Sequence, residues 1–148
     1  VEIQALVAPT SLPMPRRSAQ GVDGGRLNVL VAVLQQRATV KFDGCDVYVS
    51  AVGGMKVSEP GADLAVALAL VSARAGTTLP ADLVACGEVG LGGEVRQVAQ
   101  TARRLSEASR LGFHRAIVPR SAPAAPVGIT AVRVATVAEA IEAARLMP

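Results

Sequence analysis

Groups that could perform covalent chemistry gather in a polar stretch at residues 53–63, directly before an apolar run that should form a helix. Ser58 offers a hydroxyl and Lys56 an amine, and a serine nucleophile needs such a base to take its proton. Both residues flank the expected helix start, outside the position where unpaired N–H groups of the first turn could hold an oxyanion. We therefore favour their interpretation as polar loop residues over a catalytic dyad.

The other titratable residues do not form a recognisable catalytic or metal-binding set. His114 is the only histidine and is predicted to be a surface residue. Glu88 and Glu94 flank a glycine turn and could act as a carboxylate pair, but acidic residues on a hairpin are usually solvated or paired with a neighbouring arginine. Cys45 and Cys86 lack metal-ligand spacing, which predicts buried or half-buried thiols in a reducing compartment. The sequence thus predicts no metal site and no catalytic residue.

The basic residues allow a different chemistry, the binding of phosphate groups. The chain carries thirteen Arg and two Lys and has a net charge of +3, which permits an anionic partner without requiring one. Five cations could form a track that contacts DNA phosphates without sequence preference: Arg16, Arg17, Arg26, Lys56 and Arg96. The alternative, solvated charges or pairs between subunits, stays open. One Tyr and two Phe leave little capacity for base stacking, which favours duplex or backbone contacts.

A buried helix at residues 62–73 is expected to position the polar stretch. Its residues are good helix formers and almost wholly apolar, so this helix must be covered on every side. Pro60 suits a first helical turn because its missing N–H would have no partner there, and Asp63 is favoured by the helix dipole. A strand at residues 46–52, apolar at its odd-numbered positions, leads into the stretch.

The remaining periodicities predict short strands and further helices. A helix at residues 24–37 begins at the N-cap Asp23, and a last helix begins at the N-cap Thr136. A helix at residues 100–111 should turn one face to the core, with Ala102, Leu105, Ala108 and Ser109. Strands are expected at residues 1–7, 40–42, 83–86, 116–118 and 129–134, and as a hairpin within 87–98. This order predicts one α/β domain (α+β type) over residues 1–148, with helices packed on a mixed sheet.

Composition narrows the class of protein further. Hydrophobic residues make up 51% of the chain and aromatic residues 2%, so the core must consist of Ala, Val, Leu and Ile. Neither a signal peptide nor a run of eighteen apolar residues is seen, so we expect a soluble, cytoplasmic protein without membrane contact. The chain begins at Val1 without a Met, as expected of a piece of a longer protein. It contains no Gly-x4-Gly-Lys-Ser/Thr loop and should bind no nucleotide by that route.

Several long motifs follow one another along the chain. The longest are Gly53-Gly54-Met55-Lys56-Val57-Ser58-Glu59-Pro60, Asp63-Leu64-Ala65-Val66-Ala67-Leu68-Ala69 and Gly87-Glu88-Val89-Gly90-Leu91-Gly92-Gly93-Glu94-Val95-Arg96. With these motifs the chain resembles, over essentially its whole length, the C-terminal, Lon-protease-like domain of the RadA (Sms) family of bacterial DNA-repair proteins. The resemblance implies the fold of the Lon proteolytic domain, which is related to the second domain of ribosomal protein S5.

The same resemblance bears on catalysis. Lon-type peptidases use a Ser at the start of the central helix and a Lys after a Gly-Glu-x-x-Leu-x-Gly stretch. Laid on this chain, these two positions are Gly61 and Ala102, so both chemical groups are absent. The resemblance therefore implies a degenerate, non-catalytic domain. A Lon-type serine peptidase with displaced catalytic residues is one alternative, and an assembly scaffold without DNA contact is another.

The resemblance also implies partners. The full-length family members carry a zinc motif and a RecA-like, DNA-dependent ATPase that drives branch migration, so ATP, Mg and Zn are implied for the full-length protein and no cofactor for this domain. They form hexameric rings, which makes other copies of the chain and DNA of any sequence the expected partners.

Overall fold

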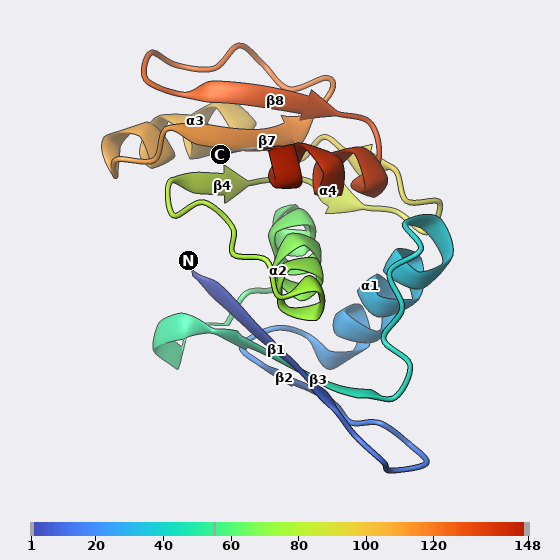
Figure 1. The fold of residues 1–148 in the computed structure, drawn as a ribbon. Coiled ribbons are helices and arrows are strands. Elements are labelled where there is room, and N and C mark those ends of the chain that lie inside the picture. Colours follow the sequence, from blue (N-terminus) through green and yellow to red (C-terminus); the bar gives the residue numbers. More distant parts are fainter. Residues whose placement is uncertain (1, 55, 147–148) are drawn as a thin grey trace.

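The computed structural model describes residues 2–54 and 56–146 and has the apolar helix α2 (Asp63–Ala75) at its centre, between two sheets (Figure 1). Gly76 ends this helix in the left-handed conformation, with a φ of 69°. Six apolar residues of α2 are buried in one core with α1 and strands of both sheets: Leu64, Val66, Ala67, Leu68, Leu70 and Val71. The predicted central buried helix is confirmed.

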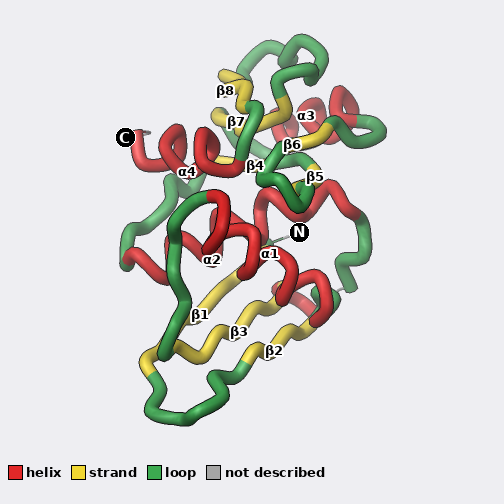
Figure 2. Tube along the Cα trace, turned by 90° about the vertical axis from the view of Figure 1, so that its right-hand side faces the viewer, coloured by secondary structure: helices red, strands yellow, loops and turns green. Residues whose placement is uncertain are grey.

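The first sheet contains β1 (Ile3–Pro9), β2 (Arg17–Gln20) and β3 (Cys45–Ala51) in the order β1-β3-β2. Figure 2 shows the three strands side by side. β1 runs antiparallel to β3 and β2 runs parallel to it, so this sheet is mixed, as predicted. Val1, the first residue of the predicted first strand, lies outside the described residues. β2 was not predicted, because its four residues show no apolar run.

Helix α1 (Gly24–Arg37) has the predicted bounds, and Asp23 caps it by accepting a hydrogen bond from the Arg26 main-chain N–H. The predicted strand at residues 40–42 is wrong. These residues form a loop whose Phe42 packs in the core. Phe42 is fully buried, and its N–H donates to the side-chain oxygen of Gln35.

The second sheet is wholly parallel, with β7 between β4 and β8. A short antiparallel hairpin of β5 and β6 surrounds the glycine turn, as predicted. Two 3-10 turns, η1 and η2, connect β3 to α2. The bounds of these elements are η1 Val52–Gly54, η2 Pro60–Ala62, β4 Leu83–Ala85, β5 Glu88–Val89, β6 Val95–Arg96, β7 Arg115–Pro119 and β8 Thr130–Val134. The α/β class of the fold is therefore confirmed.

Two further helices cover the second sheet, α3 (Thr101–Arg110) and α4 (Val137–Leu146). The predicted cap of α4 is confirmed, since the Thr136 hydroxyl accepts from the Glu139 N–H. The predicted inner face of α3 needs one correction. Ala102 is exposed and Thr101 is buried in its place. Within residues 2–54 and 56–146, no helix combines the length and apolar character needed to span a membrane.

Candidate functional site: the start of helix α2

The start of α2 is tied to the strand–hairpin junction by backbone hydrogen bonds. Gly61 is buried, and its carbonyl accepts from the Gly87 N–H at 3.0 Å, while the Leu64 N–H donates to the Gly87 carbonyl at 3.1 Å. A Cβ atom at position 61 would lie 3.3 Å from Cγ2 of Val98 and 3.4 Å from Cζ of Arg104. The position that a Lon-type serine would occupy is therefore closely surrounded.

Arg104 supplies the charge nearest to Gly61. Its guanidinium binds the Glu59 carboxylate through two hydrogen bonds of 2.7 and 3.1 Å. The hydrogen bond to Arg104 lowers the pKa of Glu59, and the one to Glu59 raises the pKa of Arg104. A guanidinium keeps its proton and cannot act as a general base. Ala102, two residues earlier on the same helix, has no group that could.

A groove of about 590 Å³ runs beside this pair, between the start of α2, strand β4 and helix α3. Cys86 is a buried thiol in its wall that sequence reasoning did not connect with Gly61. Burial raises the pKa of Cys86, so the thiol stays protonated and is a weak nucleophile. Ser58 and Lys56 also line the groove, and both are exposed, as expected of loop residues. This groove therefore lacks an activated nucleophile among the described residues.

Asp63 has a larger role than the helix-dipole effect predicted for it. Its side chain is only 5% exposed and accepts hydrogen bonds from Nε of Arg26 at 3.0 Å and from the Val89 N–H at 3.1 Å. Arg26 forms an ion pair with Asp63 and also donates to the Val89 carbonyl at 2.6 Å. The hydrogen bond to Asp63 raises the pKa of Arg26. The three residues join α1, α2 and β5. The signal in the sequence was a carboxylate, Asp63, at the start of an otherwise apolar helix.

Two more cations of the predicted phosphate track are engaged within the protein. Arg17 donates to the main-chain carbonyl of Cys45 at 2.6 Å. Arg96 pairs with Glu94 at 2.7 Å and lies 3.9 Å from Glu88, so the predicted ion pairing of these acids is confirmed. Arg26 and Arg96 line one hollow at the hairpin, away from Arg16 and Arg17 on the first sheet.

Arg16 and Lys56 are exposed, and their side chains make no hydrogen bond or ion pair within the described part of the chain. Arg16 directly precedes β2. Lys56 lies beyond the other end of that strand, because the next residue, Val57, donates its N–H to the Gly21 carbonyl. Of the five predicted phosphate contacts, these two are the ones whose side chains bind no other group among the described residues.

The predictions for His114 and the two cysteines hold in the structure. His114 is exposed, and Cys45 and Cys86 are buried free cysteines. Within residues 2–54 and 56–146, no group of three or more His, Cys, Asp or Glu residues could hold a metal ion.

Comparisons with known proteins identify relatives of this chain. A family model described as "ChlI: Subunit ChlI of Mg-chelatase" matches residues 28–122. The protein named DNA repair protein RadA of Brucella abortus is 55% identical over 119 residues, which cover 80% of this chain and 26% of that protein. The RadA of Mycolicibacterium smegmatis is 45% identical over 144 residues, 97% of this chain and 31% of that protein. The RadA of Synechocystis is 48% identical over 120 residues, which cover 81% of this chain and 24% of that protein.

The chain thus spans about a quarter to a third of the length of these relatives. Their similarity confirms the resemblance to RadA that the sequence motifs indicated. Because the ChlI model matches well over half of the residues, the chain belongs to the family described as subunit ChlI of Mg-chelatase, with RadA-type DNA repair proteins among its relatives.

Proposed function

We propose that this chain is a non-catalytic, DNA-binding and ring-forming domain of a RadA-type DNA repair protein. The observation that carries the proposal is the similarity to proteins named DNA repair protein RadA over 80–97% of the chain. The start of α2 supports the non-catalytic part, because Gly61 has no nucleophile and its nearest charged neighbour is a guanidinium paired with Glu59. The full-length protein would add the ATP, Mg and Zn sites of a DNA-dependent ATPase.

The proposed DNA contact depends on the two available cations, Arg16 and Lys56. Both are exposed, and they lie beyond opposite ends of strand β2. Arg17 holds the segment that carries Arg16 by binding the Cys45 carbonyl. A chain with a net charge of +3 would bind DNA weakly, whereas a hexameric ring multiplies the contacts. DNA binding and assembly should therefore be coupled.

Replacing Arg16 and Lys56 together by Ala should weaken DNA binding about equally for all sequences. Each lost phosphate contact should flatten the slope of log K against log salt by about 0.9, because fewer condensed counterions are released. Fluorescence anisotropy at several salt concentrations measures the slope. The Arg103→Ala/Arg145→Ala variant removes the same charge from exposed positions on α3 and α4 and should keep the wild-type slope.

One result would favour an assembly scaffold without DNA contact. If the Arg16→Ala/Lys56→Ala variant binds DNA as the wild type does and its assembly state collapses, the chain is a scaffold and these cations join subunits. Sedimentation velocity measures that state.

A peptidase assay tests the remaining alternative, a Lon-type serine peptidase with displaced catalytic residues. We expect no turnover of an unstructured protein substrate at high concentrations of the chain, because no described residue of the groove pairs an activated nucleophile with a base. Turnover that Ser58→Ala abolishes, and that Ser106→Ala on the exposed side of α3 leaves intact, would establish a peptidase with displaced catalytic residues.

A further inference from the structure

Strand β1 forms one edge of the first sheet, and part of its backbone faces away from β3. The Val52 N–H donates to the Glu2 carbonyl, and in an antiparallel pair every second residue bonds to the partner strand. The even-numbered residues of β1 therefore bond to β3, whereas Ile3, Ala5 and Val7 direct their N–H and carbonyl groups to the open edge. No described group binds them there. This edge thus offers a row of unused hydrogen-bond donors and acceptors.

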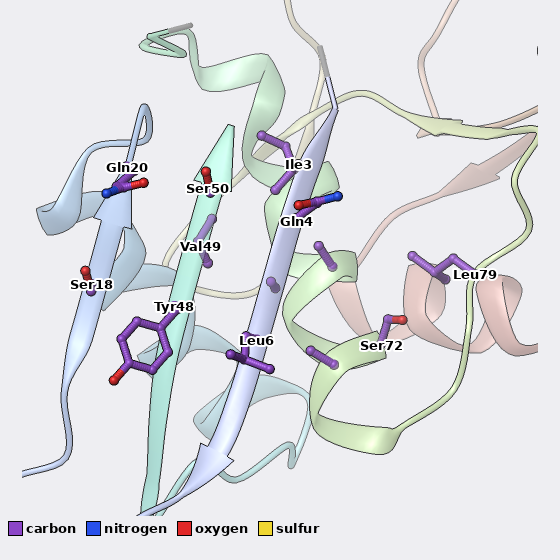
Figure 3. A pocket seen from close by; sticks show the side chains of 13 residues that line it. Ile3, Gln4, Leu6, Ser18, Gln20, Tyr48, Val49, Ser50, Ser72 and Leu79 are labelled. Carbon is purple, nitrogen blue, oxygen red and sulfur yellow. The ribbon is translucent and has the colours of Figure 1, made fainter. Parts of the chain in front are cut away.

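Open strand edges are usually protected by charged side chains, prolines or a covering loop. Residues 3–8 of β1 include no charged residue and no proline. A cavity of about 650 Å³ follows the edge and continues over the outer face of the sheet. Ala69, Ser72 and Ala73 of α2 line it together with Leu79, and Figure 3 shows Ser72 and Leu79 on the side of β1 away from β3. The edge of β1 and these side chains form a slot that an extended segment can enter as a further strand.

The loop between β1 and β2, residues 10–16, carries side chains that suit this slot. It extends past the ends of both strands (Figure 1, lower right). Leu12 is 45% exposed and Met14 is 83% exposed, and neither belongs to a buried cluster of the described residues. Two neighbouring apolar side chains exposed on a projecting loop indicate a protein contact.

The prolines of this loop restrict how it can pair. Pro13 and Pro15 follow Leu12 and Met14, and a residue before a proline prefers an extended conformation. Residues 12–14 bend in the single chain, so docking would straighten them. In an added strand, Leu12 and Met14 direct their N–H and carbonyl groups to one edge. The prolines then lie at the positions directed to the other edge, where no N–H is needed.

We propose that residues 10–15 of one copy of the chain add to β1 of the next copy as an antiparallel strand. This inference rests on the proposed ring-forming function and names the surfaces that join the copies. Leu12 then lies opposite Ala5 and Met14 opposite Ile3, so both apolar side chains face the small residues of α2. Because loop and slot are different surfaces, the contact is head-to-tail, and a ring closes when every slot is filled.

Charge favours the antiparallel direction. Arg16 directly follows the docked segment, and its side chain makes no hydrogen bond or ion pair within the described part of the chain. Antiparallel pairing carries Arg16 to the end of β1 where Glu2 is exposed. Parallel pairing would carry it to the other end, where β1 has no charged residue. The attraction between Arg16 and Glu2 therefore supports the proposed orientation.

Sedimentation velocity over a range of concentrations measures the assembly. The loop variant, Leu12→Asp/Met14→Asp, places charges at the docked side chains and should raise the Kd of assembly by about 100-fold or more. Its fold should be retained, because these side chains belong to neither buried cluster. The control Leu111→Asp/Val127→Asp makes the same change at two other exposed apolar residues and should assemble as the wild type does.

Mixing two defective variants tests the head-to-tail geometry. The slot variant, Ala73→Arg, fills the slot with a long side chain and should also stay monomeric. Ala75→Arg, at an exposed position of the same helix, should assemble normally. The loop variant keeps its slot and the slot variant keeps its loop, so equal amounts of both should form a heterodimer and nothing larger. An excess of a peptide of residues 9–16 should dissociate the wild-type assembly, whereas the same peptide with Ser in place of Leu12 and Met14 should not.

The opposite outcomes separate this inference from the proposed function. If the loop variant assembles as the wild type does, the copies join elsewhere, which overturns the inference and leaves the ring-forming function intact. If the mixed variants stay monomeric although circular dichroism shows both to be folded, the loop does not enter the slot. A wild-type chain that stays monomeric at every concentration would overturn both the inference and the ring-forming part of the proposed function.

Discussion

Replacing Asp63 by Ala is expected to lower the free energy of unfolding by about 2–4 kcal/mol. The substitution removes the acceptor for Nε of Arg26 and for the Val89 N–H, and so leaves a buried N–H and a partly buried cation without their partner. The expected loss lies slightly below that of a fully buried ion pair because 35% of the Arg26 side chain remains exposed. Urea unfolding followed by circular dichroism measures it.

A double-mutant cycle with Arg26→Ala separates the ion pair from the bond to Val89. The double variant should lose less than the sum of the single variants, because the two side chains contact each other directly. Glu107→Ala breaks an exposed pair with Arg110 and should leave the free energy of unfolding nearly unchanged. A loss below about 1 kcal/mol for Asp63→Ala would mean that water replaces the carboxylate and that this residue does not hold α1, α2 and β5 together.

Replacing Leu68 by Ala should cost about 2–5 kcal/mol, through lost burial and the cavity that remains. Leu68 lies in the middle of α2 and is 3% exposed, within the core that both sheets share. The matched control is Leu111→Ala, whose side chain is 63% exposed and loses little contact. Denaturant melts of both variants give the difference. A loss of unfolding free energy below about 0.5 kcal/mol for Leu68→Ala would mean that α2 contributes little to the stability of the fold.

The elements that sequence reasoning found are those with a local cause. Helix α1 was predicted with its observed bounds because an N-cap, Asp23, precedes a helical apolar period. Helix α2 was recognised because apolar residues on all its sides require burial. The glycine hairpin and the Thr136 cap likewise depend on neighbouring residues.

The errors have a tertiary cause. Strand β2 has few apolar residues of its own and exists because β3 supplies its hydrogen-bond partners. The apolar residues at 40–42 suggested a strand, but Phe42 is buried from a loop and bonds to Gln35. Ala102 was assigned to the inner face of α3, yet the core receives Thr101 instead. For β2, a distant segment decided the local conformation.

By itself, the sequence determined the α/β class and the central buried helix, because composition and period are properties of short segments. Only the tertiary structure decided which basic side chains bind groups within the protein. Arg26 and Arg17 look like exposed cations in sequence, but folding gives them Asp63 and the Cys45 carbonyl as partners. It also places Tyr48 between strands β1 and β2, since strand register joins residues that lie far apart in the chain.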